Sequence, residues 1–95
     1  MGTITSFKLG NIVMTRSIAI DVEESAKFAR EVTKALRRYA SGDWGDTCAE
    51  DAQMNNEAVK NGDRILAVYH TSKGNVWIIT EWDRSATTIL YPEDY

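Results

Sequence analysis

The sequence predicts one small α+β domain, in which an N-terminal strand and two helices precede a three-stranded antiparallel β-meander. Three observations predict this class. The chain has 95 residues, a length typical of a single domain. Its middle part has helical periodicity, and its last third has short runs of β-branched and aromatic residues between turn signals. We therefore expect residues 1–95 to form one domain around one modest core.

The N-terminal strand is expected at residues 11–20, which combine β-branched and apolar side chains. Residues 2–10 are polar and flanked by glycine, so we expect them to be a frayed start of the chain.

A first helix is expected over residues 23–40, because apolar side chains recur there at helical spacing. Glu23 and Glu24 suit the positive end of the helix dipole, and Arg37 and Arg38 suit its negative end. The apolar stripe consists of Phe28, Val32, Ala35, Leu36 and Tyr39.

A second helix is expected from Thr47 to about Asn61, with Gly62 as its left-handed stop. Thr47 and Glu50 have the spacing of a capping box. The apolar stripe of this helix is thin, so the helix is expected to lie on the surface.

The meander is expected from three runs, residues 64–71, 76–82 and 87–91. With hairpin tips at residues 73–74 and 84–85, the register sorts the side chains onto two faces. The first, which we call the aromatic face, includes Tyr69, Ile78, Trp82, Ile89 and Tyr91. The second, the aliphatic face, includes Leu66, Val68, Ile79 and Leu90.

The two faces receive different roles in this interpretation. The aliphatic face is expected to pack on helix 23–40, and the aromatic face to bind a protein partner or a second copy as a two-fold homodimer. Tyr69, Trp82 and Tyr91 are its expected partner-binding residues. A slip of one residue in either turn would exchange the faces of a strand.

The turn at residues 42–46 holds a further partner-binding candidate, in which Trp44 stands between Asp43 and Asp46. An exposed tryptophan beside acids would anchor a partner. The other interpretation, which the sequence favours, is that Trp44 folds back onto the core, as the glycines on both sides permit.

The residues next to the second hairpin tip form the densest polar cluster, Glu81, Asp83 and Arg84. They could bind a small ligand or a cation, or serve a small enzyme. The favoured interpretation is structural, with Asp83 opening a turn and Arg84 paired locally.

The composition limits which classes of function fit the sequence. Cys48 and His70 are each the only residue of their type, so we expect no disulfide, no metal site and no cofactor. The sequence lacks a long apolar run and the common nucleotide-binding and catalytic motifs, which favours a cytoplasmic, non-enzymatic protein without membrane contact.

Charge is distributed unevenly along the chain, whose net charge is −3. Residues 22–41 carry five basic and three acidic side chains, a net charge of +2. Residues 42–63 carry one basic and six acidic side chains, a net charge of −5. These segments could pair internally, which is favoured, or present an acidic face to a partner. A third interpretation is a nucleic-acid binder that uses the basic helix 23–40, but nucleic acid is not an expected partner of a protein that is acidic overall.

Several strings of the sequence carry a family resemblance. They are residues 8–16 (KLGNIVMTR), 42–46 (GDWGD), 60–64 (KNGDR), 76–81 (VWIITE), 83–90 (DRSATTIL) and 92–95 (PEDY). Over nearly the whole chain they resemble small uncharacterised "plasmid-related" proteins of mobile elements in Gram-positive bacteria. The resemblance implies an accessory protein that acts by binding another protein, one version being antagonism of a host defence system such as restriction or CRISPR. It implies no catalytic residue.

Overall fold

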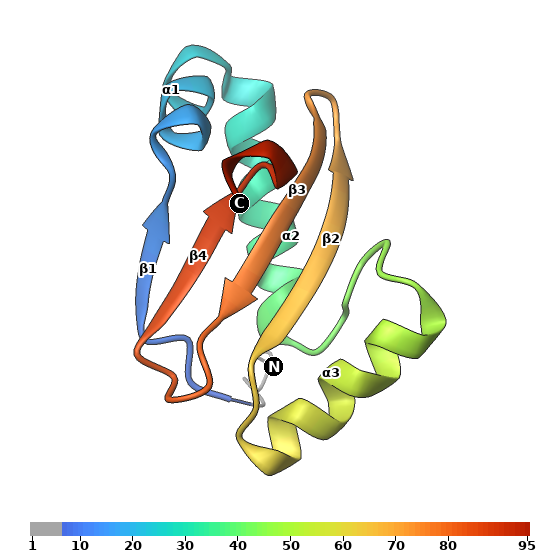
Figure 1. Cartoon of the computed structure of the whole chain (residues 1–95). Helices are drawn as coiled ribbons and strands as arrows, with labels where there is room; N and C mark the ends of the chain where they lie inside the picture. Colours follow the sequence, from blue (N-terminus) through green and yellow to red (C-terminus); the bar gives the residue numbers. More distant parts are fainter. Residues whose placement is uncertain (1–6) are drawn as a thin grey trace, which may run out of the picture.

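The structure, a computed structural model, describes residues 7–95, so the expected frayed start lies outside the described residues as far as Ser6. The described part is an α+β domain with a four-stranded mixed sheet (Figure 1). In chain order the elements are β1 (Asn11–Met14), α1 (Arg16–Glu24), α2 (Ala26–Ala40), α3 (Ala49–Asn61), β2 (Ile65–Thr71), β3 (Gly74–Thr80), β4 (Ala86–Leu90) and the 3-10 helix η1 (Pro92–Asp94).

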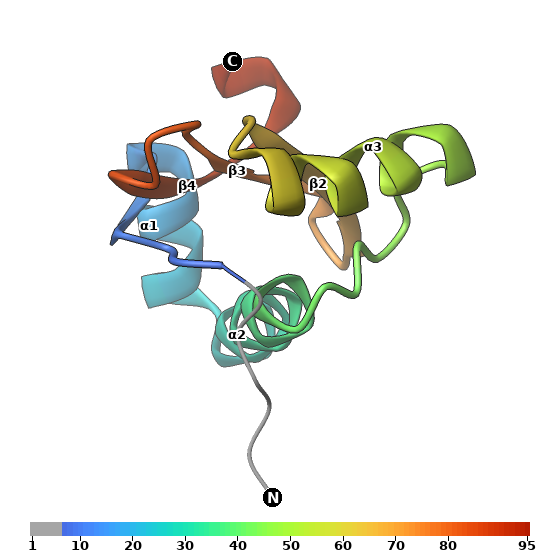
Figure 2. The ribbon, with the colours of Figure 1, turned by 90° about the horizontal axis from the view of Figure 1, so that it is seen from below.

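The sheet has the strand order β1-β4-β3-β2. Strands β2, β3 and β4 form the expected antiparallel meander, and β1 adds to its far side in parallel with β4. β1 and β2 are therefore the two edge strands. Helices α1 and α2 lie on one side of the sheet, η1 lies on the other, and α3 lies beside β2 (Figure 2).

The expected long N-terminal strand is corrected by the structure. Only residues 11–14 are extended, and the chain turns into α1 at Arg16. Ile18 is fully buried on this helix, with Val22 one turn further along beside the core. This spacing of four residues is helical, and it was hidden in a run whose composition favours β-structure.

Helix α2, which corresponds to the expected helix 23–40, starts later than expected. Ser25 separates α1 from α2, and its side chain accepts a hydrogen bond from the backbone N–H of Phe28 (3.1 Å), as an N-cap does. Glu23 and Glu24 consequently end α1 instead of opening α2. The buried stripe of α2 and its basic last turn are as expected.

Helix α3 corresponds to the second helix expected from the sequence. It ends where expected but begins later than Thr47. Gly62 has a φ of 76° and stops α3 after Asn61. No capping box forms, because the Thr47 hydroxyl donates to the carbonyl of Trp44 (2.6 Å) and accepts from the N–H of Val68 (2.9 Å). The hydroxyl thus joins the turn to β2 and leaves the helix uncapped by a side chain.

The hairpin register differs from expectation by two residues in both turns. Tyr69 pairs with Val76 and Ile78 pairs with Ile89, because the first tip lies at Ser72-Lys73 and the second turn is longer. A shift of two residues keeps the side chains within the strands on their expected faces, since the strand period is two. Trp82, which was expected on the aromatic face, lies beyond the end of β3 at Thr80, in the second turn.

The aromatic face is not the exposed face that was expected, which is the main correction, and on the aliphatic face Ile79 and Leu90 are buried as well. The aromatic face is the core face: Tyr69 is 2% exposed and Tyr91 8%, and Ile78 and Ile89 are also buried. Helix α2 covers this face, with the rings of Phe28 and Tyr91 stacked at 6.1 Å. Tyr69 and Tyr91 therefore offer no surface to a partner.

A chain of buried hydroxyls explains why a face so rich in threonine can be a core. The Tyr39 hydroxyl pairs with that of Thr80 (2.6 Å), which pairs with that of Thr87 (2.7 Å). Thr87 in turn donates to the carbonyl of Leu9 (2.7 Å). Hydrogen bonding removes the cost of burying these polar atoms, and burial raises the pKa of Tyr39 to about 12.

Candidate binding surface

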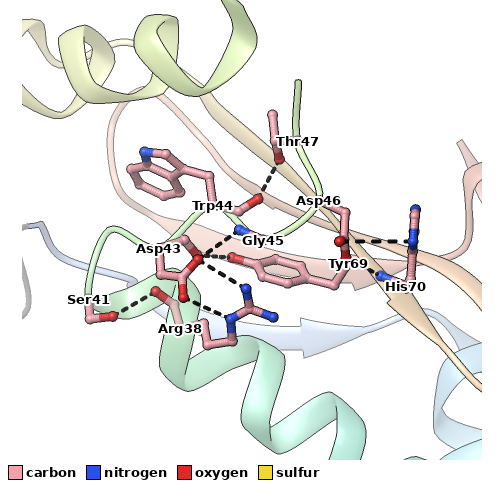
Figure 3. Close-up of polar contacts among 9 residues, drawn as sticks. All are labelled: Arg38, Ser41, Asp43, Trp44, Gly45, Asp46, Thr47, Tyr69 and His70. Carbon is pink, nitrogen blue, oxygen red and sulfur yellow. Dashed lines mark hydrogen bonds and ion pairs between the residues drawn. The ribbon is translucent and has the colours of Figure 1, made fainter. Parts of the chain in front are cut away.

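The turn that carries Asp43, Trp44 and Asp46 runs from the end of α2 to the outer edge of β2 (Figure 3). Gly45 has a φ of 65°, and its α-carbon lies so close to the ring of Tyr69 that a side chain there would collide with it. Glycine is therefore required both by the backbone conformation and by the packing.

Asp43 is held from three directions. The Arg38 Nε and Nη2 donate to its carboxylate at 2.9 and 3.2 Å, and the N–H of Gly45 donates at 3.0 Å. These donors, Arg38 first, hold the pKa of Asp43 below its usual range. The Arg38 guanidinium lies 5.6 Å from the ring centre of Tyr69, whose hydroxyl donates to the Asp43 carbonyl (2.8 Å). Asp43 is thus a clamp on the turn.

Asp46 and Thr47 occupy the outer edge of β2. The Asp46 carboxylate accepts from the backbone N–H of His70 (2.8 Å), and the Asp46 N–H donates to the carbonyl of Val68 (2.8 Å). Thr47 accepts from the Val68 N–H. The predicted partner-binding acids Asp43 and Asp46 are brought together in one turn, where both make internal contacts.

Trp44 folds back onto the core, as the favoured interpretation of the sequence has it. It is 6% exposed, and its ring meets that of Tyr39 edge to face at 5.5 Å. Its indole N–H donates to the side chain of Asn56 (2.8 Å). The alternative, an exposed anchor for a partner, is wrong for Trp44.

The polar cluster at the second hairpin turn is used structurally. Asp83 accepts from the N–H of Ser85 (3.0 Å), which closes an Asx turn. Hydrogen bonding by the side chain of Ser85, and then by its backbone N–H, lowers the pKa of Asp83. The Arg84 guanidinium donates to the carbonyls of Asp63 (2.7 Å), Ala58 (3.0 Å) and Glu81 (3.1 Å). Arg84 therefore ties this turn to the end of α3, and among the described residues it forms no ion pair with Glu81 or Asp83.

Few basic side chains of residues 22–41 form ion pairs with acidic side chains of residues 42–63. Among residues 7–95, Arg38–Asp43 is the one carboxylate–guanidinium pair within 4 Å. The other basic residues of α2 and the acidic residues of α3 do not pair with one another. The favoured interpretation, internal pairing of the two segments, therefore holds for one pair, and α3 presents its acids outward.

A groove of about 480 Å³ lies between α3 and the start of β2. Its rim carries three carboxylates and one guanidinium, and Met54, which is 65% exposed, supplies apolar surface. The lining residues are Asp51, Met54, Asn55, Glu57, Ala58, Asn61, Asp63, Arg64 and Leu66.

Trp82 lies in the second hairpin turn, which Arg84 ties to two residues that line this groove. It is 68% exposed and belongs to the same turn as Arg84, which binds the carbonyls of the groove residues Ala58 and Asp63. Of the aromatic residues predicted to bind a partner, Trp82 is the one that the described structure leaves exposed. We call the groove together with Trp82 the acidic groove surface.

Comparison of the chain with protein-family models, curated proteins and solved structures finds no match. The structure also bears on two expectations about class. Within residues 7–95, no helix is long and apolar enough to cross a membrane. Cys48 is exposed at the start of α3, and no group of three or more potential metal ligands occurs among the described residues.

Sequence reasoning missed Asn55, which is 5% exposed on α3. Its side chain donates to the carbonyl of Leu66 (2.8 Å) and accepts from the Leu66 N–H (3.3 Å), as a neighbouring strand would. A signal for it was present. Asn55 lies seven residues after Cys48 and four before Val59, so it is a polar residue within the apolar stripe of α3.

Proposed function

We propose that the protein is a non-enzymatic accessory protein that acts by binding another protein through the acidic groove surface. The observation that carries the proposal is an exposed tryptophan in a turn that is hydrogen-bonded to a groove with an acidic rim and an exposed methionine. Tryptophan often carries binding energy at interfaces, and methionine adapts its shape to different partners. The charge of the rim favours a partner segment that is basic and has apolar side chains.

Two further features support a binding role for α3. Asn55 and Ala58 are its buried residues, so most of the helix surface is available. Its base is nevertheless fixed, because Asn55 and Arg84 hold it to β2 and to the second hairpin turn. A fixed, exposed surface loses less conformational entropy on binding than a mobile one.

The resemblance to mobile-element proteins indicates which partner to test. Such elements benefit from accessory proteins that antagonise host defences, so a component of a restriction or CRISPR system is the partner that we would test first. A second copy of the chain is the other candidate partner.

Affinity capture from a nuclease-treated host extract tests the proposal. The wild-type chain should retain a specific protein, and the double variant Asp51→Lys/Glu57→Lys and the variant Trp82→Ala should lose it. The control Glu23→Lys/Glu24→Lys makes the same change of charge at the end of α1 and should retain it. Capture that survives both groove variants would contradict the proposal, provided that circular dichroism shows all four proteins folded.

A further inference from the structure

The outer edge of β1 is unlike the rest of the sheet. Ile12, Val13 and Met14 are 48%, 44% and 43% exposed, although they are consecutive residues of a strand. The N–H groups of Asn11 and Thr15 donate to the carbonyls of Ser85, just before β4, and of Ile89 in β4, at 3.0 Å each. Backbone groups alternate in direction along a parallel strand, so those of Ile12 and Met14 point away from the sheet. Within residues 7–95 they have no hydrogen-bond partner.

This edge also lacks the features that usually prevent strand pairing. Residues 11–14 contain no charge, no proline and no bulge. The edge of β2, by contrast, is already occupied by the side chains of Asn55, Asp46 and Thr47. The sheet can therefore be extended on one side only.

We propose that β1 pairs with β1 of a second copy of this chain, antiparallel and centred on Val13, to give a two-fold dimer with one continuous sheet. In this register Ile12 lies opposite Met14 of the second copy, and their outward backbone groups form the hydrogen bonds of the new ladder. Val13 lies opposite Val13 on the other face of the sheet. The interface is self-complementary, and the closed β2 edge ends the assembly at two copies.

Charge complementarity supports a second copy as the occupant. The same register brings the start of α1, at Arg16, toward Gly10 of the second copy. Gly10 packs against the carbonyls of Arg84 and Ser85 in the turn that carries the exposed Asp83. Figure 1 shows that turn beside the start of β1 and α1 beyond the end of β1, so antiparallel pairing brings each Arg16 toward an opposite charge.

The test is the oligomeric state of the purified chain by sedimentation equilibrium, over concentrations that span dissociation constants from about 1 μM to about 1 mM. We expect a monomer–dimer equilibrium without larger species. Val13→Lys places two like charges opposite each other and should weaken the dimer at least about tenfold. The control Thr33→Lys introduces the same charge at an exposed position of α2 and should leave the dimer unaffected.

A charge-swap experiment tests the register itself. Val13→Lys and Val13→Glu should each be monomeric, and an equimolar mixture should form a heterodimer because opposite charges then face each other. Ile12→Pro removes the outward N–H of residue 12 without removing a hydrogen bond to β4, and should also weaken the dimer. A wild-type chain that stays monomeric, a dimer insensitive to Val13→Lys, or a mixture that fails to associate would overturn the proposal. Because the groove variants do not alter β1, these results are independent of partner capture.

Discussion

The two edges of the sheet contrast in how they treat their outward backbone groups. At the β2 edge, side chains or backbone of Asp46, Thr47 and Asn55 bind the outward groups of Leu66 and Val68 and the N–H of His70. At the β1 edge, the outward groups of Ile12 and Met14 face solvent beside exposed apolar side chains. The residues that close the β2 edge come from the segment between α2 and β2, which packs beside that strand.

This difference shows that an edge strand can be closed without a further strand. Asn55 supplies one donor and one acceptor with the geometry of a peptide group, and Thr47 and Asp46 supply the rest. Unpaired edges invite association, and proteins usually protect them. The β2 edge is protected, whereas β1 retains the features of a pairing surface.

The largest effect is expected from opening the closed edge at Asn55. Asn55→Ala leaves both the N–H and the carbonyl of Leu66 without their partner, so the free energy of unfolding should fall by about 2–4 kcal/mol. Chemical denaturation measures the change. Gln53→Ala, an exposed position on the same helix, is the control and should change stability by less than about 0.5 kcal/mol. Equal effects of the two substitutions would show that Asn55 does not hold the edge.

A smaller effect is expected at Thr47. Thr47→Val keeps the shape of the side chain but removes the oxygen that accepts from Val68, and should cost about 1–2 kcal/mol in thermal or chemical unfolding. Thr33→Val is the matched control, since its hydroxyl donates to the Ala29 carbonyl on the exposed side of α2. If Thr33→Val lowered the free energy of unfolding as much as Thr47→Val, the Thr47 hydroxyl would have no special role at the β2 edge.

The smallest effect concerns acid. The pKa of Asp43 is lowered in the folded protein, so its contribution to stability is present above the ordinary pKa of aspartate and is lost as pH falls through the lowered value. Below about pH 4, the wild type should therefore lose stability more steeply than Asp43→Asn, by about 0.5 kcal/mol at most because the pair is partly exposed. If the free energies of unfolding of the two proteins fell in parallel as the pH was lowered, the proposed role of Asp43 in holding the turn would be wrong.

The sequence predicted the α+β class, the stripe of α2, the stop at Gly62 and the meander, because each depends on local periodicity or on glycine geometry. It did not predict α1, whose β-favouring residues are helical because Ile18 must reach the core. It also misassigned the core face of the sheet. That choice depends on Tyr39, which reaches Thr80 from a helix 41 residues away in the chain. No local pattern reports such a contact.

The candidate surface was predicted in part. Trp82 is exposed, but in the second hairpin turn and not on the sheet face where it was expected, whereas Tyr69, Tyr91 and Trp44 are core residues. Asp43 and Asp46 were recognised as a pair around one turn, but their internal partners come from α2 and β2. The groove depends on how α3 packs beside β2, and the openness of β1 depends on its place at the end of the strand order.

Amide hydrogen exchange tests the contrast between the edges most directly. In dilute solution the N–H groups of Leu66 and Val68 should exchange slowly, since side chains bind them, whereas those of Ile12 and Met14 should exchange at nearly the rate of an unprotected peptide. Raising the concentration should protect Ile12 and Met14 alone. Equal protection of the two edges in a dilute monomer would contradict the account.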